Sequence, residues 1–232
     1  MSGATDDGLR GGQATGGRLL TPRGLRTRAR LVTAARRVFE EIPFRQARLT
    51  DITAAAGVAA GTFYTYFDSK EEIFREVADE VLLELSRAAR RDPDNTEGDA
   101  IRDIAYASRQ YFLACLRNAG VVRSMEQLAV TDDGINKSRR HTVRVGVKRV
   151  ERWIRRLQER GICDRELDPR TTAIALHTMN VRVAYDHLML SGDPSDVEPL
   201  VAAVTRVWAR TVGLEQPSRH PVGAGPDPVL SA

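Results

Sequence analysis

The chain has 232 residues, of which 42% are hydrophobic and 28% are charged, and its formal net charge is +4 at pH 7. This length allows one or two hydrophobic cores, and the apolar runs are far shorter than the roughly 18 residues that a membrane-spanning helix needs, so we expect a soluble protein with no membrane partner. The N-terminus lacks the apolar segment of a secretory signal, which favours the cytoplasm, and the two isolated cysteines argue against a disulfide framework or a cysteine-based metal site.

Residues 1–20 and 215–232 are rich in small residues and glycine or proline, and neither segment has periodic apolar residues, so we predict two disordered tails. Between them apolar residues recur at helical spacing, and no stretch alternates with a period of two. The sequence therefore predicts an all-α fold, with an N-terminal domain over 21–78 and a larger helical domain over 79–214.

The N-terminal domain is expected to contain a long helix, two short ones and the start of a fourth. We place them at residues 26–41, residues 50–56, residues 60–66 and from Ser69 onward. Pro43 must end the first helix, and Gly57 ends the second. Ser69 and Glu72 have the spacing of a capping box, so a helix begins there.

The larger domain is expected to contain five further helices, which the apolar spacing places at about residues 99–118, 121–130, 133–160, 168–190 and 194–213. Gly161 is a typical helix stop. Asp168 with Pro169, and Asp193 with Pro194, match a capping residue followed by a proline in the first turn.

The two short helices around Gly57 have helix-turn-helix geometry, in which the second helix enters the major groove of DNA. Its hydroxyl groups would face outward, and Gly61 would let the backbone approach the duplex closely. Between Arg18 and Lys70 about ten basic residues stand against four acidic ones, which suits a polyanionic partner. A solvated helix face is the alternative interpretation of this charge excess.

At this motif the sequence resembles the TetR family of bacterial transcriptional regulators, over about residues 26–78. The matching residues are Gly57, Val58, Gly61, Thr62, Tyr64, Tyr66, Phe67 and Lys70. Three positions depart from the family pattern. Ala59 replaces the serine that commonly caps the recognition helix, and Ala60 and Thr65 stand where longer polar residues are common. We therefore expect sparse base readout and strong dependence on phosphate contacts.

The resemblance implies which residues contact DNA. The predicted set is Arg23, Arg26, Arg28, Thr50, Ala60, Gly61, Thr62, Tyr64, Thr65, Tyr66 and Lys70. Within this set, Thr50, Tyr66, Lys70 and the N-terminal arginines are assigned to phosphates.

The resemblance also implies that the C-terminal helices hold a small-molecule pocket and pair with a second subunit. The pocket candidates are Tyr106, Phe112, Met125, Trp153, His177, Asn180 and Tyr185, and for each of them a place in the core or the dimer interface is the alternative. If buried, His177 and Asn180 need polar partners from a ligand, a neighbouring helix or the other subunit. A homodimer is expected because the last two helices are rich in apolar residues, namely Ile174, Leu176, Val183, Leu188, Leu200, Val204 and Trp208.

The function expected from these features is that of a dimeric repressor, which binds a pseudo-palindromic operator in double-stranded DNA and is released by a small-molecule effector. A ligand-responsive activator and a non-specific architectural DNA-binding protein are the alternatives. No catalytic motif is recognisable and the four histidines lack metal-ligand spacing, so we expect neither an enzyme, a metal site nor a cofactor. The arginine-rich helix ending near Arg160 is expected to be mainly solvated, with an anionic ligand site as the alternative.

Overall fold

The computed structural model describes residues 21–90, 98–189 and 193–214, and in these ranges it contains helices and no strand, which confirms the all-α prediction. The elements are α1 (Pro22–Glu41), α2 (Leu49–Ala56), α3 (Ala60–Phe63), α4 (Lys70–Ala88), α5 (Ala100–Arg117), α6 (Ala119–Leu128), α7 (Asp133–Glu159), α8 (Pro169–Val183), the π-helix η1 (Ala184–Met189), the 3-10 helix η2 (Pro194–Asp196) and α9 (Val197–Thr211). The predicted tails lie outside the described residues. No helix in the described ranges is long and apolar enough to cross a bilayer.

Side-chain caps explain where most helices begin. The hydroxyl oxygen of Ser69 accepts a hydrogen bond from the Glu72 backbone at 3.1 Å, and carboxylates cap α5, α7 and α8 in the same way. Helix α1 begins four residues earlier than predicted, because Thr21 caps it and Pro22 fits its first turn. Helix α2 begins at Leu49, where the Asp51 carboxylate accepts the Arg48 N–H at 2.8 Å, so Thr50 is not its cap.

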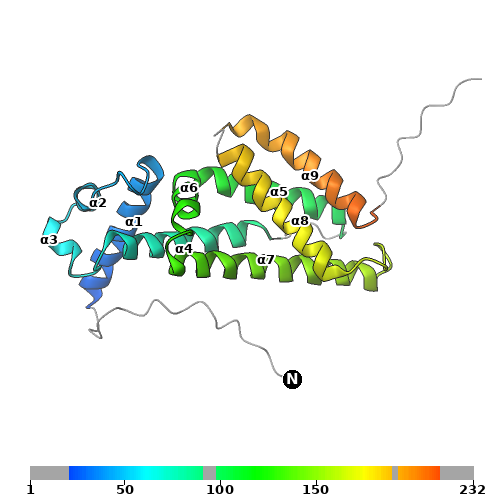
Figure 1. Ribbon diagram of the computed structural model, residues 1–232, viewed down its shortest axis with the longest axis horizontal. Coiled ribbons are helices and arrows are strands. Elements are labelled where there is room, and N and C mark those ends of the chain that lie inside the picture. Colours follow the sequence, from blue (N-terminus) through cyan, green and yellow to red (C-terminus); the bar gives the residue numbers. More distant parts are fainter. Residues whose placement is uncertain (1–20, 91–97, 190–192, 215–232) are drawn as a thin grey trace, which may run out of the picture.

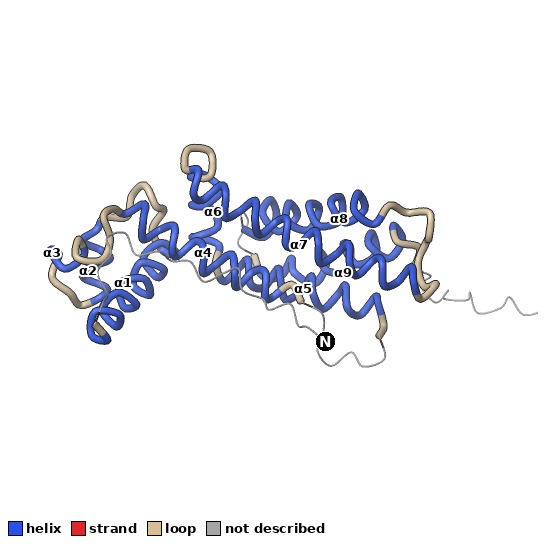
Figure 2. The backbone as a smooth tube through the Cα atoms, turned by 90° about the horizontal axis from the view of Figure 1, so that it is seen from below, coloured by secondary structure: helices blue, strands red, loops and turns tan. Residues whose placement is uncertain are grey.

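The molecule is elongated, with α1 to α3 at one end and α5, α8 and α9 at the other (Figures 1 and 2). Helix α4 runs from the first end along α7 into the larger part, so it crosses the predicted domain boundary at 78–79 without a break. Helix α6 stands across the bundle and contacts both α1 and α4. The two ends are therefore connected by a continuous helix and by a second, separate contact.

Three phenylalanines form the core where α1, the following loop and α4 meet. The ring centroids of Phe39, Phe44 and Phe74 lie 4.9 to 5.7 Å apart, and all three side chains are buried. Burying a side chain of this size contributes roughly 1.5–3 kcal/mol each. This cluster holds the N-terminal helices against the base of α4.

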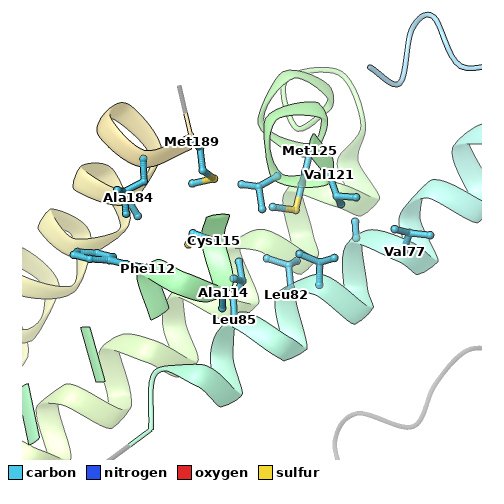
Figure 3. Close-up of a cluster of buried hydrophobic side chains, with 14 of the residues drawn as sticks. Val77, Leu82, Leu85, Phe112, Ala114, Cys115, Val121, Met125, Ala184 and Met189 are labelled. Carbon is cyan, nitrogen blue, oxygen red and sulfur yellow. The ribbon is translucent and has the colours of Figure 1, made fainter. Parts of the chain in front are cut away.

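Further along α4 the core continues between α5, α6 and η1 (Figure 3). Leu85, Phe112, Cys115, Met125 and Met189 lie together there and are nearly inaccessible to solvent. Burial raises the pKa of the Cys115 thiol to about 12, so the thiol stays protonated and behaves as a small apolar group. Cys115 is thus part of the hydrophobic core.

Candidate nucleic-acid interface and internal cavity

The turn between α2 and α3 is built on Gly57, which adopts a left-handed conformation with φ of 63°. From α1, the Arg30 guanidinium donates a hydrogen bond to the Ala56 carbonyl at 2.6 Å and so holds the end of α2. A Cβ atom on Gly57 would lie 3.2 Å from the same guanidinium group. Both the backbone conformation and the neighbour therefore require glycine here.

Helix α3 is held to the core by aromatic side chains on its inner face. Phe63 and Phe67 are buried, with ring centroids 5.7 Å apart. Ala59 offers no side-chain cap, as predicted, and α3 spans four residues instead of seven, because Tyr64 to Tyr66 form turns. Two buried phenylalanines fix the short helix where a cap is missing.

The outer face of α3 is open to solvent. Ala60, Gly61, Tyr64 and Thr65 are exposed, and the Tyr64 side chain is 62% accessible, whereas Thr62 and Tyr66 are half-buried. Gly61 has an ordinary φ angle, and no atom lies within 4 Å of a Cβ atom placed on it. Nothing within the described fold requires a glycine at this position.

Exposed arginines surround this face. Arg23 and Arg26 at the start of α1 form no ion pair with the described residues, and Thr50 is exposed at the start of α2. Arg45 and Arg48, in the loop before α2, are exposed as well. Both belong to the basic excess between Arg18 and Lys70, but they were not among the predicted DNA contacts, because their exposure depends on the path of the loop.

Two predicted phosphate contacts have intramolecular roles in the structure. Arg28 forms a bidentate ion pair with Glu76 of α4, and its guanidinium carbon lies 4.8 Å from the centroid of the Phe67 ring. The Lys70 ammonium group donates to the carbonyl groups of Phe44 and Ala47 at 2.7 and 2.8 Å. Both cations fix α1 and the following loop to α4, so we propose structural support as their role in place of the predicted phosphate contacts.

The N-terminal helices are tied to the rest of the molecule through α6. The Glu40 carboxylate accepts hydrogen bonds from the backbone N–H groups of Gly120 at 2.8 Å and Val121 at 3.4 Å, in the first turn of α6. A Cβ atom on Gly120 would overlap the Glu40 backbone, so the helices cross closely. Burial raises the pKa of Glu40, although both backbone hydrogen bonds lower it. No local pattern in the sequence pairs these distant segments.

A cavity of about 540 Å³ lies between the end of α4 and helices α5, α7 and α8, with Trp208 of α9 at one wall. Trp153, His177 and Asn180, three of the predicted pocket residues, line it. Residues three and four apart lie on one face of a helix, and the cavity-lining face of α7 carries Arg149, Arg152, Trp153 and Arg156. The sequence left an anionic ligand site on this helix as the alternative to a solvated face, and it did not single out these arginines because the helix has basic residues on every side.

A smaller cavity of about 70 Å³ adjoins the first, and Tyr111, Arg149, His177 and Val181 line both. The predicted residues Met125 and Tyr185 line only this smaller cavity. All five of the predicted residues that reach a cavity therefore belong to two adjoining spaces.

The predicted pocket residues Tyr106 and Phe112 line neither of these two cavities. The face of α5 that borders the larger cavity carries Ile104, Ser108 and Tyr111. Phe112 is one position further round the helix and packs into the core shown in Figure 3. Moving by one position along a helix rotates the side chain by about 100° around the helix axis. The spacing of apolar residues in the sequence does not show which of two neighbouring residues faces the cavity.

Asn180 has hydrogen-bond partners on neighbouring helices, and His177 packs against α7. Asn180 donates to the Ser108 hydroxyl at 3.1 Å and accepts from the Trp208 indole N–H at 3.0 Å, which joins α5, α8 and α9. The His177 ring occupies the space where Gly146 of α7 has no side chain. Burial and the charge of Arg149 lower the pKa of His177 to about 4, so the ring is neutral at pH 7.

Comparisons with known proteins agree with this geometry. Residues 31–77, which contain the helix-turn-helix, match the model of the family described as "Bacterial regulatory proteins, tetR family". This match identifies the helix-turn-helix region as a TetR-family DNA-binding domain. This TetR-family protein is a DNA-binding transcriptional regulator, as the sequence resemblance implied.

Individual relatives extend the similarity along the TetR-family chain. The HTH-type transcriptional regulator EthR of Mycolicibacterium smegmatis is 21% identical over 200 residues, which cover 83% of this chain and 92% of the relative. The uncharacterized HTH-type regulator YdgC of Bacillus subtilis is 40% identical over 55 residues, covering 24% of this chain and 28% of the relative. The solved structure of Salmonella enterica GusR superposes with a TM-score of 0.66 at 16% identity, covering 84% of this chain and 98% of that one, and it shares the fold.

Four of the apolar residues from which a homodimer was expected lie in the core of the single chain. Leu176, Leu188, Val204 and Trp208 are buried within the single chain, so they are not free for a partner. The apolar side chains that α8 and α9 leave exposed are smaller and fewer. They include Ile174, Ala175, Ala202, Ala203 and Val207, of which Ile174 and Val207 are 46% and 45% accessible.

Proposed function

We propose that this regulator is a repressor that binds a pseudo-palindromic operator as a homodimer and is released when a small molecule fills its internal cavity. The observation that carries the proposal is the exposed outer face of α3, made of Ala60, Gly61, Tyr64 and Thr65, at the opposite end of the molecule from the cavity. The cytoplasm is the compartment in which such a protein would meet DNA.

On the DNA side, the exposed face of α3 would enter the major groove, with Gly61 allowing close approach. Tyr64 and Thr65 present hydroxyl groups that can meet base edges or phosphates. Arg23, Arg26, Arg45 and Arg48 would neutralise phosphates around the groove, which makes the affinity fall with salt. We no longer include Arg28 and Lys70, because both are used inside the protein.

On the ligand side, the cavity has a volume within the range of roughly 300–1,000 Å³ that small-molecule sites usually have. Ser86 and Ala89 at the end of α4 line it, and Met125 of α6 lines the adjoining space. Helix α4 follows the helix-turn-helix directly in the chain, and α6 contacts α1 through Glu40. A ligand that shifts α4 and α6 would therefore change the position of α3. A purely architectural DNA-binding protein would not need such a cavity.

The homodimer would form through the exposed apolar residues of α8 and α9. Ile174 and Val207 are large side chains at the surface, and the alanines beside them let helices approach closely. A two-fold axis there would present two copies of α3 to successive turns of one face of the DNA, which matches a pseudo-palindromic site.

A footprint of the purified protein on the DNA upstream of its own gene tests the proposal. We expect a protected pseudo-palindrome that weakens with added salt and disappears in a Tyr64→Ala, Thr65→Ala double variant. Val130→Ala, at an exposed apolar residue in the α6–α7 turn, is the control and should keep the footprint. Protection that lacks sequence preference, or that survives in the double variant, would contradict the proposal. Reporter transcription that falls when the gene is deleted would contradict the repressor role.

A further inference from the structure

We propose that the effector of this regulator is an anionic amphiphile, with a carboxylate or phosphate head that binds the arginines of α7 and an apolar part that lies against the two tryptophans. The inference rests on the proposed function, because it takes the larger cavity as the effector site. It adds the chemical class of the ligand, which the family resemblance does not supply.

The charges around the cavity are strongly unbalanced. Arg90, Arg149, Arg152 and Arg156 line it, and Asp103 is the acidic residue among the lining side chains. None of these four guanidinium groups forms an ion pair with any residue in the described ranges. By contrast Arg155, on the outer side of the same helix, pairs with Glu151 at 2.8 Å. Three cations of α7, Arg149, Arg152 and Arg156, thus line the cavity without an ion-pair partner among the described residues.

Arg149 is the deepest of these cations, because it lines both cavities. Its guanidinium group donates to the Ser86 carbonyl at 2.7 Å, and this is a neutral acceptor. Burial lowers the pKa of Arg149, and the nearby charges of Arg90 and Arg152 lower it further. Arg149 is half-buried and has no anion beside it, which is unfavourable, so an oxyanion between these three arginines would stabilise its charge.

Much of the remaining wall is apolar or aromatic, beside the polar side chains of Ser108, His177 and Asn180. The rings of Trp153 and Trp208 lie 6.1 Å apart at a tilt of 58°, and Ile104, Val150 and Val181 also line the cavity. The adjoining smaller cavity is lined by Met125 and other apolar side chains. An apolar chain or ring attached to the anion would bury its surface there, whereas a fully polar anion such as inorganic phosphate would leave these walls unused.

Intrinsic fluorescence tests the ligand chemistry directly, because Trp153 and Trp208 are the only two tryptophans of the chain and both line the cavity. The full chain is titrated with dodecanoate, dodecyl phosphate, dodecanol, dodecyltrimethylammonium and inorganic phosphate, each below any micelle-forming concentration. We expect the two anionic amphiphiles to bind about tenfold or more tighter than dodecanol, inorganic phosphate and the cationic amphiphile. A difference between dodecanoate and dodecyl phosphate identifies the preferred head group.

Matched variants test the assigned residues. We expect Arg149→Gln to weaken dodecanoate binding about tenfold and to leave dodecanol binding unchanged, whereas Arg155→Gln changes neither. If Arg149→Gln does not fold, judged by circular dichroism, the Arg152→Gln, Arg156→Gln double variant at exposed positions replaces it and should show the same selective loss. Equal affinities for dodecanoate and dodecanol, saturation by inorganic phosphate alone, or no response to either anionic amphiphile would overturn the inference.

The fluorescence readout needs no DNA, so it separates this inference from the proposed function. A preparation that protects its operator and shows no preference for anions contradicts the ligand chemistry and leaves DNA binding in place. A preparation that binds dodecanoate through Arg149 and protects no DNA contradicts the proposed function instead.

Discussion

Gly57 and Gly61 stand four residues apart in one motif, yet the described fold needs a glycine only at the first. Gly57 has a positive φ and touches Arg30, whereas Gly61 has an ordinary φ and open space around it. We expect Gly57→Ala to destabilise the protein by about 1–2 kcal/mol, and Gly61→Ala to be neutral or stabilising by up to about 1 kcal/mol, because alanine favours helix. Urea unfolding followed by circular dichroism measures both values.

Gly61→Ala also tests DNA contact separately from stability, because it should not destabilise the protein. Gly61→Ala should bind the operator about tenfold more weakly, because its methyl group would lie between α3 and the duplex. Fluorescence anisotropy with a labelled operator provides the affinity. An unchanged affinity would show that α3 does not approach DNA at Gly61.

Arg26 and Arg28 offer a second contrast on α1, since one is exposed and the other is paired with Glu76. We expect Arg26→Gln to weaken operator binding and to reduce the slope of log affinity against log salt by about 1, with unchanged stability. Arg28→Gln should instead lower the free energy of unfolding. Salt titrations of both variants, compared with unfolding curves, check this, and a reduced salt slope in Arg28→Gln alone would reverse our assignment.

For individual residues, the sequence predicted which side chains are exposed better than it predicted which residues contact each other. Tyr64, Thr65 and Gly61 are exposed as expected, because a glycine-bounded motif fixes which face of a short helix turns outward. The internal partners of Arg28 and Lys70 were not predicted, since their acceptors lie 48, 26 and 23 positions away in the chain. Local patterns contain no information about such distant contacts.

Among the elements, α6 links the N-terminal helices to the larger domain, because Glu40 of α1 caps its first turn. Glu40→Ala should destabilise the protein by roughly 0.5–2 kcal/mol, as the loss of a helix cap does. Glu40→Gln keeps a hydrogen-bond acceptor and removes the charge. Chemical unfolding of the wild type and both variants measures these changes.

The pH dependence of that cap has a definite sign. Burial raises the pKa of Glu40 above its ordinary value of 4.5, so the folded state holds this proton more tightly than the unfolded state. The stability that Glu40 contributes is therefore fully present below pH 4.5 and is lost as the pH rises through its raised pKa. Relative to wild type, Glu40→Gln should become more stable over that rise. A constant difference between the two proteins across the titration would contradict this assignment.

The helices themselves were predicted well, and their ends less well. Capping residues and proline positions located α4, α5, α7 and α8 to within a few residues. The π-helix η1 and the shortness of α3 were not predicted, because both depend on how the chain packs against neighbouring helices. The cavity was predicted only in part for the same reason, since it depends on which faces of four helices meet.

For the whole molecule, dimerisation through α8 and α9 is the assembly that the proposal requires. We expect Val207→Glu to give a monomer, because a charge buried at an interface costs several kcal/mol, and to abolish operator binding at concentrations where the wild type binds. Val130→Glu, at a residue that is 85% accessible in the α6–α7 turn, is the matched control. Light scattering after gel filtration determines the mass. A Val207→Glu protein that remains a dimer would place the interface elsewhere.

The central claim is that the cavity and the α3 surface are coupled, and the most direct measurement is a reciprocal titration. Operator affinity is measured by anisotropy with the cavity empty and with it saturated by a compound that changes tryptophan fluorescence, and the affinity of that compound is then measured with and without operator. The account predicts that each partner weakens the other by the same factor, on the order of 10 to 100, because linkage requires reciprocity. Identical operator affinities with the cavity empty and filled would contradict it.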